Sequence, residues 1–282
     1  MTNTIINSLI QLLEDPDDEV YFNVKNKFLE YGPPIIAKLE KVWEENPESL
    51  IQTRVEEIIC LIQFNYHYHL LQKWLASSKK DLIEFWIILT RHQFPNFDER
   101  PYFKQLSILE NEAKHSIRCI EEDFEKIAAF NHFLFQKIGF KGNTKNYHSP
   151  KNSCINYVMD NKKGNPLSLS VIYLHLSNRI GLPICGVNMP RHFIVGFENE
   201  GMGDPIKFYI NPFSKGTILN RHDLTFFLQK ENINEETKYF SPCGNAEIAK
   251  RMLNNLLYSY TYQDNKEKSV ELIKFLELFK HV

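Results

Sequence analysis

Apolar residues recur at steps of three and four positions through the first 120 residues of the chain. This spacing places them on one face of an α-helix, and the alternation typical of strands is almost absent. Residues 1–120 are therefore expected to form an all-helical N-terminal domain. The clearest run of these positions consists of Val24, Phe28, Ile35, Leu39 and Trp43.

Local signals predict where two of these helices begin and end. Asp15, Pro16 and the three acidic residues that follow supply a capping side chain, a first-turn proline and negative charge, all favoured at a helix N-terminus. The helix should end at the Gly-Pro-Pro sequence of residues 32–34, which breaks helices. A second helix should then run until Pro47.

A shift of 31 residues aligns apolar positions of the N-terminal half with later ones. Stacked helical hairpins of the HEAT type would produce such a repeat. Coincidence is the alternative, because any two amphipathic helix pairs align at some offset. The aligned pairs are Val24 with Val55, Phe28 with Ile59, Leu39 with Leu70 and Trp43 with Trp74.

The pattern changes after residue 120. Residues 121–139 predict one amphipathic helix, and residues 164–183 predict a buried helix between a glycine-proline start and a glycine-proline stop. Two β-branched and aromatic runs, 192–197 and 207–213, flank a turn-rich segment and predict an antiparallel hairpin. Together these elements indicate an α+β core, and the chain should close with a helical pair.

Composition and charge exclude several classes of protein. The 33 basic and 35 acidic residues balance to a net charge of −2, which argues against a broad nucleic-acid-binding surface. The five cysteines form no Cys-x-x-Cys pair, and His67 and His69 point to different helix faces, so neither disulfides nor a zinc site is expected. No basic leader and no apolar run of membrane-spanning length occurs, which predicts a cytoplasmic protein that binds no membrane.

Two polar residues of the predicted hairpin could carry chemistry. His192 lies near the start of the first strand, and Asn211 lies on the second. In papain-like and transglutaminase-like folds, a nucleophile at a helix N-terminus faces a His and an Asp or Asn on adjacent strands. A histidine hydrogen-bonded within the core is the alternative for His192.

The central sequence resembles a known family. The run GFKGNTKNYHSPKNSCINYVMDNKKGNPLSLSVIYLHLSNRIGLPICGVNMPRHFIVGF, followed by FYINPFSKG, is similar to the bacterial SirB family over roughly residues 120–230. This resemblance implies a transglutaminase-like core at 121–240, after a helical region at 1–120. It also implies a tetratricopeptide-like tail at 241–282, where GNAEIAKRMLNNLLYSYTYQDNKEKSVELIKFL is similar to a single such hairpin.

The resemblance also assigns positions to the superfamily triad. Active members open the buried helix with Gly-x-Cys, whereas Pro166 occupies the cysteine position here. His192 falls on the triad histidine, and Asn211 falls where the family usually has Asp. Ser168, in the first turn, could replace the cysteine only if His192 lies within hydrogen-bond reach; otherwise it is a polar helix-start residue. Cys154 is expected to be a buried, inert thiol rather than a displaced nucleophile.

Other family positions could line the pocket. Asn143, Asn152 and Ser153 match the family and would either border the pocket or pin the loop through side-chain hydrogen bonds. Pro166 should border it as well, and Arg191, which replaces a glycine, would favour an anionic ligand.

Two functions follow from these assignments. The first is a non-catalytic, regulatory module that binds a protein or peptide and needs no cofactor. The second is a hydrolase or acyl transferase acting on an amide or ester, with Ser168 as nucleophile, His192 as base and Asn211 orienting the imidazole.

Overall fold

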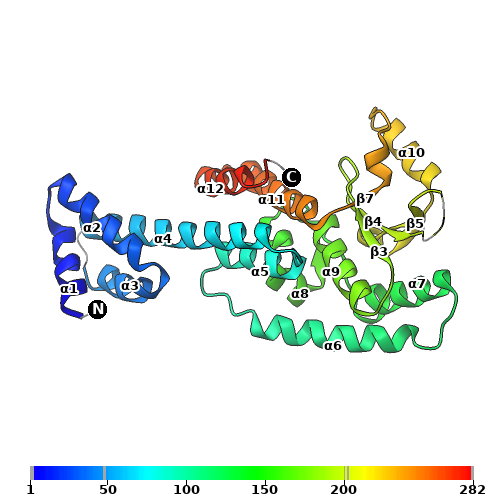
Figure 1. The fold of residues 1–282 in the computed structure, drawn as a ribbon, viewed down its shortest axis with the longest axis horizontal. Helices are drawn as coiled ribbons and strands as arrows, with labels where there is room; N and C mark the ends of the chain where they lie inside the picture. Colours follow the sequence, from blue (N-terminus) through cyan, green and yellow to red (C-terminus); the bar gives the residue numbers. More distant parts are fainter. Residues whose placement is uncertain (1–2, 47–48, 200, 202, 281–282) are drawn as a thin grey trace. The chain divides into compact units, whose positions relative to one another are not determined.

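The computed structural model describes residues 3–46, 49–199, 201 and 203–280. Pro47, at which the second predicted helix should stop, lies outside them. The chain divides into two compact units, Met1–Lys73 and Trp74–Val282 (Figure 1), and the boundary falls within one long helix.

The first unit is entirely helical in its described residues, as the apolar spacing predicts. Its interior is formed by apolar side chains of successive helices, among them Val24, Phe28, Leu39, Val55 and Ile58. The elements are α1 (Asn3–Gln11), η1 (Leu12–Glu14), α2 (Asp18–Tyr31), η2 (Pro33–Ile35), α3 (Ile36–Glu45) and α4 (Ser49–Ala76), the last of which continues into the second unit.

The start of α2 differs in detail from the sequence expectation. The N-cap is Asp17, whose carboxylate accepts a hydrogen bond from the Glu19 backbone at 2.7 Å. Asp15 acts two residues earlier, because its carboxylate accepts from the backbone N–H of Asp17 at 2.9 Å. The helix ends at Gly32, whose φ of +66° is one that a glycine adopts without strain.

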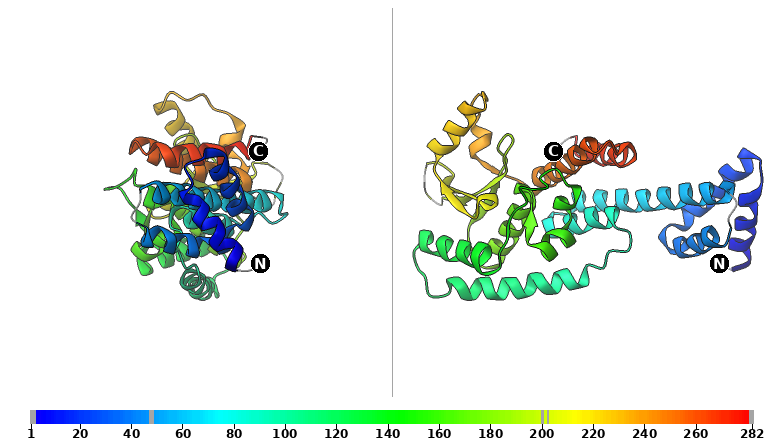
Figure 2. Two further views of the ribbon diagram at one scale, coloured as in Figure 1. Left: turned by 90° about the vertical axis from the view of Figure 1, so that its left-hand side faces the viewer. Right: turned by 180° about the vertical axis from the view of Figure 1, so that it is seen from behind.

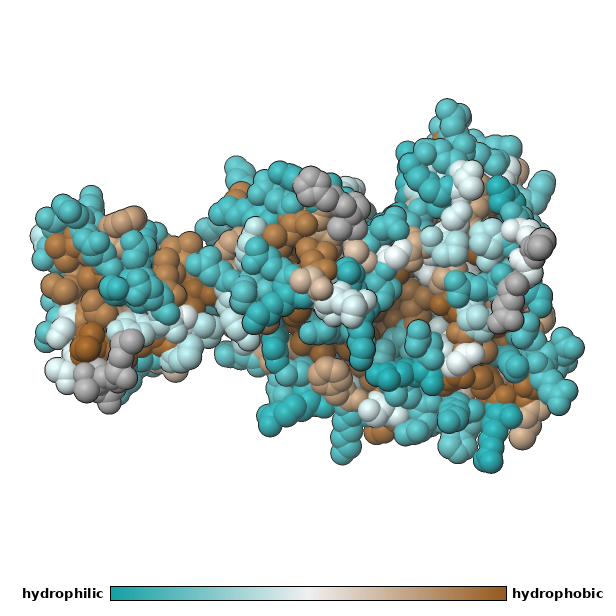
Figure 3. Space-filling model, in the orientation of Figure 1, coloured by the Kyte–Doolittle hydropathy of each residue, from teal (hydrophilic) through white to brown (hydrophobic). Residues whose placement is uncertain are grey.

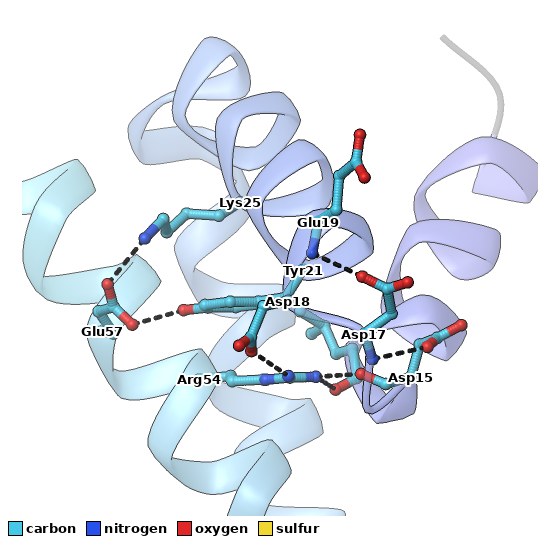
Figure 4. Close-up of polar contacts among 9 residues, drawn as sticks. Asp15, Asp17, Asp18, Glu19, Tyr21, Lys25, Arg54 and Glu57 are labelled. Carbon is cyan, nitrogen blue, oxygen red and sulfur yellow. Dashed lines mark hydrogen bonds and ion pairs between the residues drawn. The ribbon is translucent and has the colours of Figure 1, made fainter.

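A polar cluster joins this helix start to α4 (Figure 4). The Arg54 guanidinium, 6% exposed, donates to the backbone carbonyls of Leu13 (2.9 Å) and Asp15 (2.6 Å) and lies 4.4 Å from the Tyr21 ring centre. Tyr21 donates to Glu57 at 2.6 Å, and burial raises the pKa of its hydroxyl. The cluster satisfies the carbonyls that η1 leaves unpaired, which is a structural role.

The predicted 31-residue repeat is not a repeat of helical hairpins. Its first copy spans two helices, α2 and α3, with a Gly-Pro-Pro break between them. Its second copy, from Val55 to Trp74, lies on the single helix α4, which contains neither glycine nor proline. The aligned apolar positions therefore reflect the common helical period alone.

The second unit combines helices with a small sheet. The predicted helix of residues 121–139 is present as an α-helix that continues into a π-helical segment. The predicted buried helix and the C-terminal helical pair are also present. The helical elements are α5 (Leu82–Gln93), α6 (Arg100–Ile117), α7 (Asp123–Asn131), η3 (His132–Lys137), η4 (Pro150–Ser153), α8 (Ile155–Asn161), α9 (Pro166–Arg179), η5 (Pro212–Ser214), α10 (Arg221–Lys230), η6 (Thr237–Phe240), α11 (Asn245–Tyr262) and α12 (Lys266–Glu277).

The main sheet is antiparallel, with the strand order β6-β5-β4-β3-β7. The predicted hairpin forms its centre, where Val195 pairs with Ile210. A separate parallel pair, β1 with β2, leads into α9. The strands are β1 (Lys141–Gly142), β2 (Lys163–Gly164), β3 (Ile184–Val187), β4 (Ile194–Glu198), β5 (Ile206–Asn211), β6 (Thr217–Leu219) and β7 (Pro242–Cys243).

Helix α9 is the central element of this unit. It contacts α6 as well as strands β3 and β4, and nearly all of its side chains are buried. Helix α10 packs through Leu224 and Leu228 against sheet residues that include Ile206 and Tyr209. Figures 1 and 2 show α10 and the α11–α12 pair on the opposite side of this unit from α6.

The domain boundary predicted near residue 120 does not coincide with the division at Lys73 and Trp74. Helices α5 and α6 belong to the second unit because they pack on α8 and α9. The C-terminal pair belongs to it as well, since α11 contacts α5 and η4.

On the face shown in Figure 3, hydrophilic side chains cover most of the surface, and apolar ones show in smaller areas between them.

Candidate functional site

The start of α9 is built by a reciprocal capping arrangement. The Asn165 side chain accepts from the Ser168 backbone N–H at 2.8 Å, and the Ser168 hydroxyl oxygen accepts from the Asn165 backbone N–H at 2.9 Å. That hydroxyl also lies 3.1 Å from the Asn165 carbonyl, to which it donates. A Cβ on Gly164 would lie 2.4 Å from the Ser168 oxygen, so only glycine fits there. Ser168 therefore serves the backbone of the helix start.

A cavity of about 430 Å³ lies at this helix start, a size typical of ligand pockets. We call it the cleft. Of the residues expected to border it, Pro166 and Arg191 do so. It is lined by Tyr147, His148, Asn165, Pro166, Leu167, Arg191, Phe193, Arg251, Asn255, Tyr258 and Ser259.

Asn143, Asn152 and Ser153 lie outside the cleft lining and form a buried hydrogen-bonded network. Asn152 donates to the carbonyls of Asn146 (2.7 Å) and Tyr147 (2.9 Å), and its own carbonyl oxygen accepts from Asn143 at 2.8 Å. The Ser153 hydroxyl accepts from Asn165 at 3.1 Å. These bonds fix the loop that carries Tyr147 to the capped start of α9.

Arg251 comes from α11 and is held by neutral groups. Its Nη1 donates to the side-chain oxygen of Asn188 at 2.5 Å and to the carbonyl of Met189 at 2.6 Å. No carboxylate among the residues that the structure describes lies within ion-pair distance of it. Burial lowers the pKa of Arg251, but a group with an ordinary value of 12.5 remains charged.

Arg191 occupies a strained backbone position. Its φ of +59° lies in the left-handed region, which favours glycine. Its guanidinium forms an ion pair with Glu231, just after α10. The positive charge of Arg191 is thus neutralised, whereas that of Arg251 is not.

His192 faces α10 rather than the start of α9. Its ring packs edge-on against Phe227, with ring centres 4.5 Å apart. Burial lowers the pKa of the imidazole, and the charge of Arg251 lowers it further. His192 is not among the residues that line the cleft.

Asn211 caps a helical turn. Its side-chain oxygen accepts from the backbone N–H groups of Phe213 (3.1 Å) and Ser214 (3.3 Å), at the start of η5. Within the described part of the chain, no hydrogen bond joins Ser168, His192 and Asn211 to one another. The three residues proposed for catalysis are therefore not assembled into a hydrogen-bonded triad.

Cys154 and Cys185, both in the second unit, carry raised pKa values. Burial raises the pKa of Cys154 to about 12, and its thiol lies 3.6 Å from the Pro150 carbonyl. Burial also raises the pKa of Cys185, on β3, to about 12. Neither thiol is a thiolate at neutral pH, so neither has the character of a reactive nucleophile.

Nowhere in the described residues do three or more His, Cys, Asp or Glu side chains gather in a group that could hold a metal ion. None of their helices is both long enough and apolar enough to cross a membrane.

The contribution of α11 to the cleft was missed by the sequence analysis. Arg251, Asn255, Tyr258 and Ser259 all project from this helix into the lining. Asn255, Tyr258 and Ser259 lie four, seven and eight positions after Arg251, which places them along one side of the helix, and Ser259 adjoins the buried apolar face. An arginine and a tyrosine on the same side of a helix could have indicated, from the sequence, that this helix contributes to a binding site.

The fold and the cleft place the chain in a class of proteins. The family model of the transglutaminase-like superfamily matches residues 100–254, which is more than half of the chain. The chain therefore belongs to the transglutaminase-like superfamily.

Particular relatives share parts of the sequence. The chain is 29% identical over 190 residues to a UPF0162 protein of Xylella fastidiosa (strain Temecula1 / ATCC 700964), covering 65% of this chain and 66% of that protein. It is 27% identical over 193 residues to the UPF0162 protein YchA of Escherichia coli K12, covering 67% and 69% of the two chains. It is 25% identical over 159 residues to the human F-box only protein 21, covering 55% and 25%.

The chain spans less than two thirds of several of these relatives, for instance 48% of the UPF0162 protein of Xylella fastidiosa strain 9a5c. No solved structure matches the chain significantly.

Proposed function

We propose that this protein is a non-catalytic, regulatory module of the cytoplasm that binds a protein or peptide segment in the cleft at the start of α9. The resemblance to the SirB family, including its tetratricopeptide-like tail, supports a role in recognition rather than in chemistry. In this proposal the ligand is held by Pro166, Arg191 and the residues of α11 that line the cleft.

The observation that carries the proposal is the capping arrangement of Ser168. A serine becomes a nucleophile when a base accepts its proton, and the dipole of a helix alone does not ionise a hydroxyl. Here the Ser168 hydroxyl donates to a backbone carbonyl and is 2% exposed. His192 packs on Phe227, and Asn211 caps η5, so neither is engaged as base or as orienting group.

Intact-mass labelling tests the absence of an activated nucleophile. The chain carrying Cys60→Ser and Cys119→Ser, which removes its exposed thiols, would be treated with a fluorophosphonate and, separately, with a thiol-directed electrophile. We expect no stoichiometric adduct from either reagent. A fluorophosphonate adduct that disappears in both Ser168→Ala and His192→Ala would overturn the proposal and establish the hydrolase or acyl-transferase alternative. A thiol adduct lost in both Cys154→Ser and His192→Ala would overturn it equally.

Peptide binding provides the positive arm. Peptides selected from a random displayed library on the intact chain would be re-measured on two variants of neighbouring α11 residues. Asn255→Trp fills the cleft, whereas Asn254→Trp places the same side chain on an exposed position. We expect the first variant to abolish binding and the second to preserve it. Equal binding by both variants would locate the peptide site elsewhere.

A further inference from the structure

The cleft combines a net positive charge with aromatic walls. Its lining contains two arginines and, among the residues described, no carboxylate. Because Glu231 already neutralises Arg191, one positive charge remains, that of Arg251. The partial positive charge at the start of α9 has the same sign.

Arg251 is positioned as an arginine that binds a ligand would be. One of its terminal nitrogens is fixed by Asn188 and Met189, and the described residues form no hydrogen bond to its Nη2 or Nε. A guanidinium in this state presents paired donors to a planar anion, and an ion pair there is strengthened by partial burial. A protein cation that serves only the fold is usually paired with an acid, as Arg191 is.

The mouth of the cleft carries exposed aromatic rings, which we call the aromatic rim. His148 lies between two tyrosines of α11, with ring centres 5.6 Å from Tyr258 and 4.7 Å from Tyr262. Tyr258 is 60% exposed, Tyr262 is 67% exposed, and Tyr147 is 43% exposed. Exposed tyrosines grouped beside an arginine are typical of binding surfaces.

We propose that the cleft binds the carboxylate of a peptide, with Arg251 receiving the carboxylate and the aromatic rim receiving an adjacent apolar side chain. This inference rests on the proposed function and names its ligand. A single unneutralised arginine matches a monoanion, whereas a phosphate monoester would bring nearly two negative charges. The apolar walls formed by Leu167 and Phe193 favour a ligand whose charge is confined to one end.

Calorimetric titration of the intact chain with three N-acetylated peptides tests whether a carboxylate is required and which carboxylate it is. The peptides are acetyl-Leu-Glu-Phe-amide, acetyl-Leu-Gln-Phe-amide and acetyl-Leu-Gln-Phe with a free C-terminal carboxylate. At least one carboxylate peptide should bind about 10-fold more tightly than the neutral amide, which corresponds to about 1.4 kcal/mol. Tighter binding of the Glu peptide would indicate a side-chain carboxylate as the natural ligand group. Tighter binding of the peptide with the free C-terminal carboxylate would indicate a chain terminus.

Variants then locate the charge. Arg251→Gln should abolish the preference for carboxylate, Arg251→Lys should retain part of it, and Arg118→Gln, at an exposed site after α6, should leave it unchanged. Asn255→Trp should block binding in the cleft but not in the neighbouring hollow of about 560 Å³, which Arg251 also borders. If Arg251→Gln fails to fold, the comparison of the three peptides on the unmodified chain still tests the carboxylate preference, and Asn255→Trp still tests whether that preference lies in the cleft.

Two results would overturn the inference. One is equal affinity, or no binding at all, for the carboxylate and the neutral peptides. The other is a preference that survives Arg251→Gln or Asn255→Trp. The proposed function would survive either result if library peptides still bind the cleft. An activated nucleophile in the labelling experiment would contradict the proposed function independently of these titrations.

Discussion

Asn152→Ala should lower the free energy of unfolding of the second unit by more than the loss of one hydrogen bond would, because the Asn152 side chain makes several. Asn152 is 1% exposed and makes three side-chain hydrogen bonds, two as donor to the carbonyls of Asn146 and Tyr147 and one as acceptor from Asn143. At roughly 1 kcal/mol for each net bond, the loss would be about 3 kcal/mol. Water can reach the carbonyls of the two exposed residues, so we expect about 2 kcal/mol.

The matched control is Asn161→Ala. Asn161 is exposed at the end of α8 and makes one side-chain hydrogen bond, to the carbonyl of Tyr157 at 2.8 Å. Its removal should change the unfolding free energy by no more than about 0.5 kcal/mol, because alanine also favours the helix. The contrast between the two asparagines isolates the effect of the buried network from that of the residue type.

Urea unfolding followed by tryptophan fluorescence can report on the second unit alone. In a Trp43→Phe background the remaining tryptophans, Trp74 and Trp86, are both buried in that unit. Trp86 also donates to the Ser153 carbonyl at 2.7 Å, directly beside the network. A loss below about 0.5 kcal/mol for Asn152→Ala, or a loss equal to the control, would refute the reasoning that these bonds hold the loop.

Two further predictions concern strain and acid. Arg191→Gly should be about 1 kcal/mol more stable than Arg191→Ala in the same urea assay, because only glycine adopts a φ of +59° without a steric cost; equal stabilities would contradict the strain. Burial alone would raise the pKa of Glu271, but the His92 ring, whose Nε2 lies 3.2 Å from the carboxylate, and a hydrogen bond from Lys268 lower it from its ordinary 4.5 to about 2. The stability that Glu271 contributes is therefore present above pH 4.5 and is lost as the pH falls from 4.5 toward 2. Burial lowers the pKa of His92 below 6.5, so stability should already decline below pH 6.5. Urea unfolding from pH 7 to pH 3 should show both declines in the unmodified chain, and Glu271→Gln should flatten the lower one.

The elements of the core were predictable because their signals are local. Helix α9 follows from its apolar spacing and from the glycine and proline at each end, and the β4–β5 hairpin follows from two β-branched runs around a turn. The division of the chain was not predictable in this way. The apolar residues of a helix such as α5 show that it is buried but not which elements cover it, and here those elements include α8, α9 and α11.

The cleft was predictable only in part, for a similar reason. Pro166 and Arg191 were expected to border it and do so. The direction of His192 depends on the left-handed backbone of Arg191, the residue before it, and no periodicity reports a single φ in a loop. The side chains of Asn211 and Ser168 satisfy nearby backbone groups, a use that competes with any role toward His192.

This competition bears on the recognition role that we propose for the cleft. Active members place a thiol at the helix start, where the first-turn N–H groups and the dipole favour its anion. In this chain Pro166 has no N–H, and the Ser168 N–H is already bonded to Asn165, so the helix start offers an anion little direct hydrogen bonding. A ligand carboxylate in the same cleft would therefore depend on Arg251 from α11. Helix α11 thus becomes part of the proposed site.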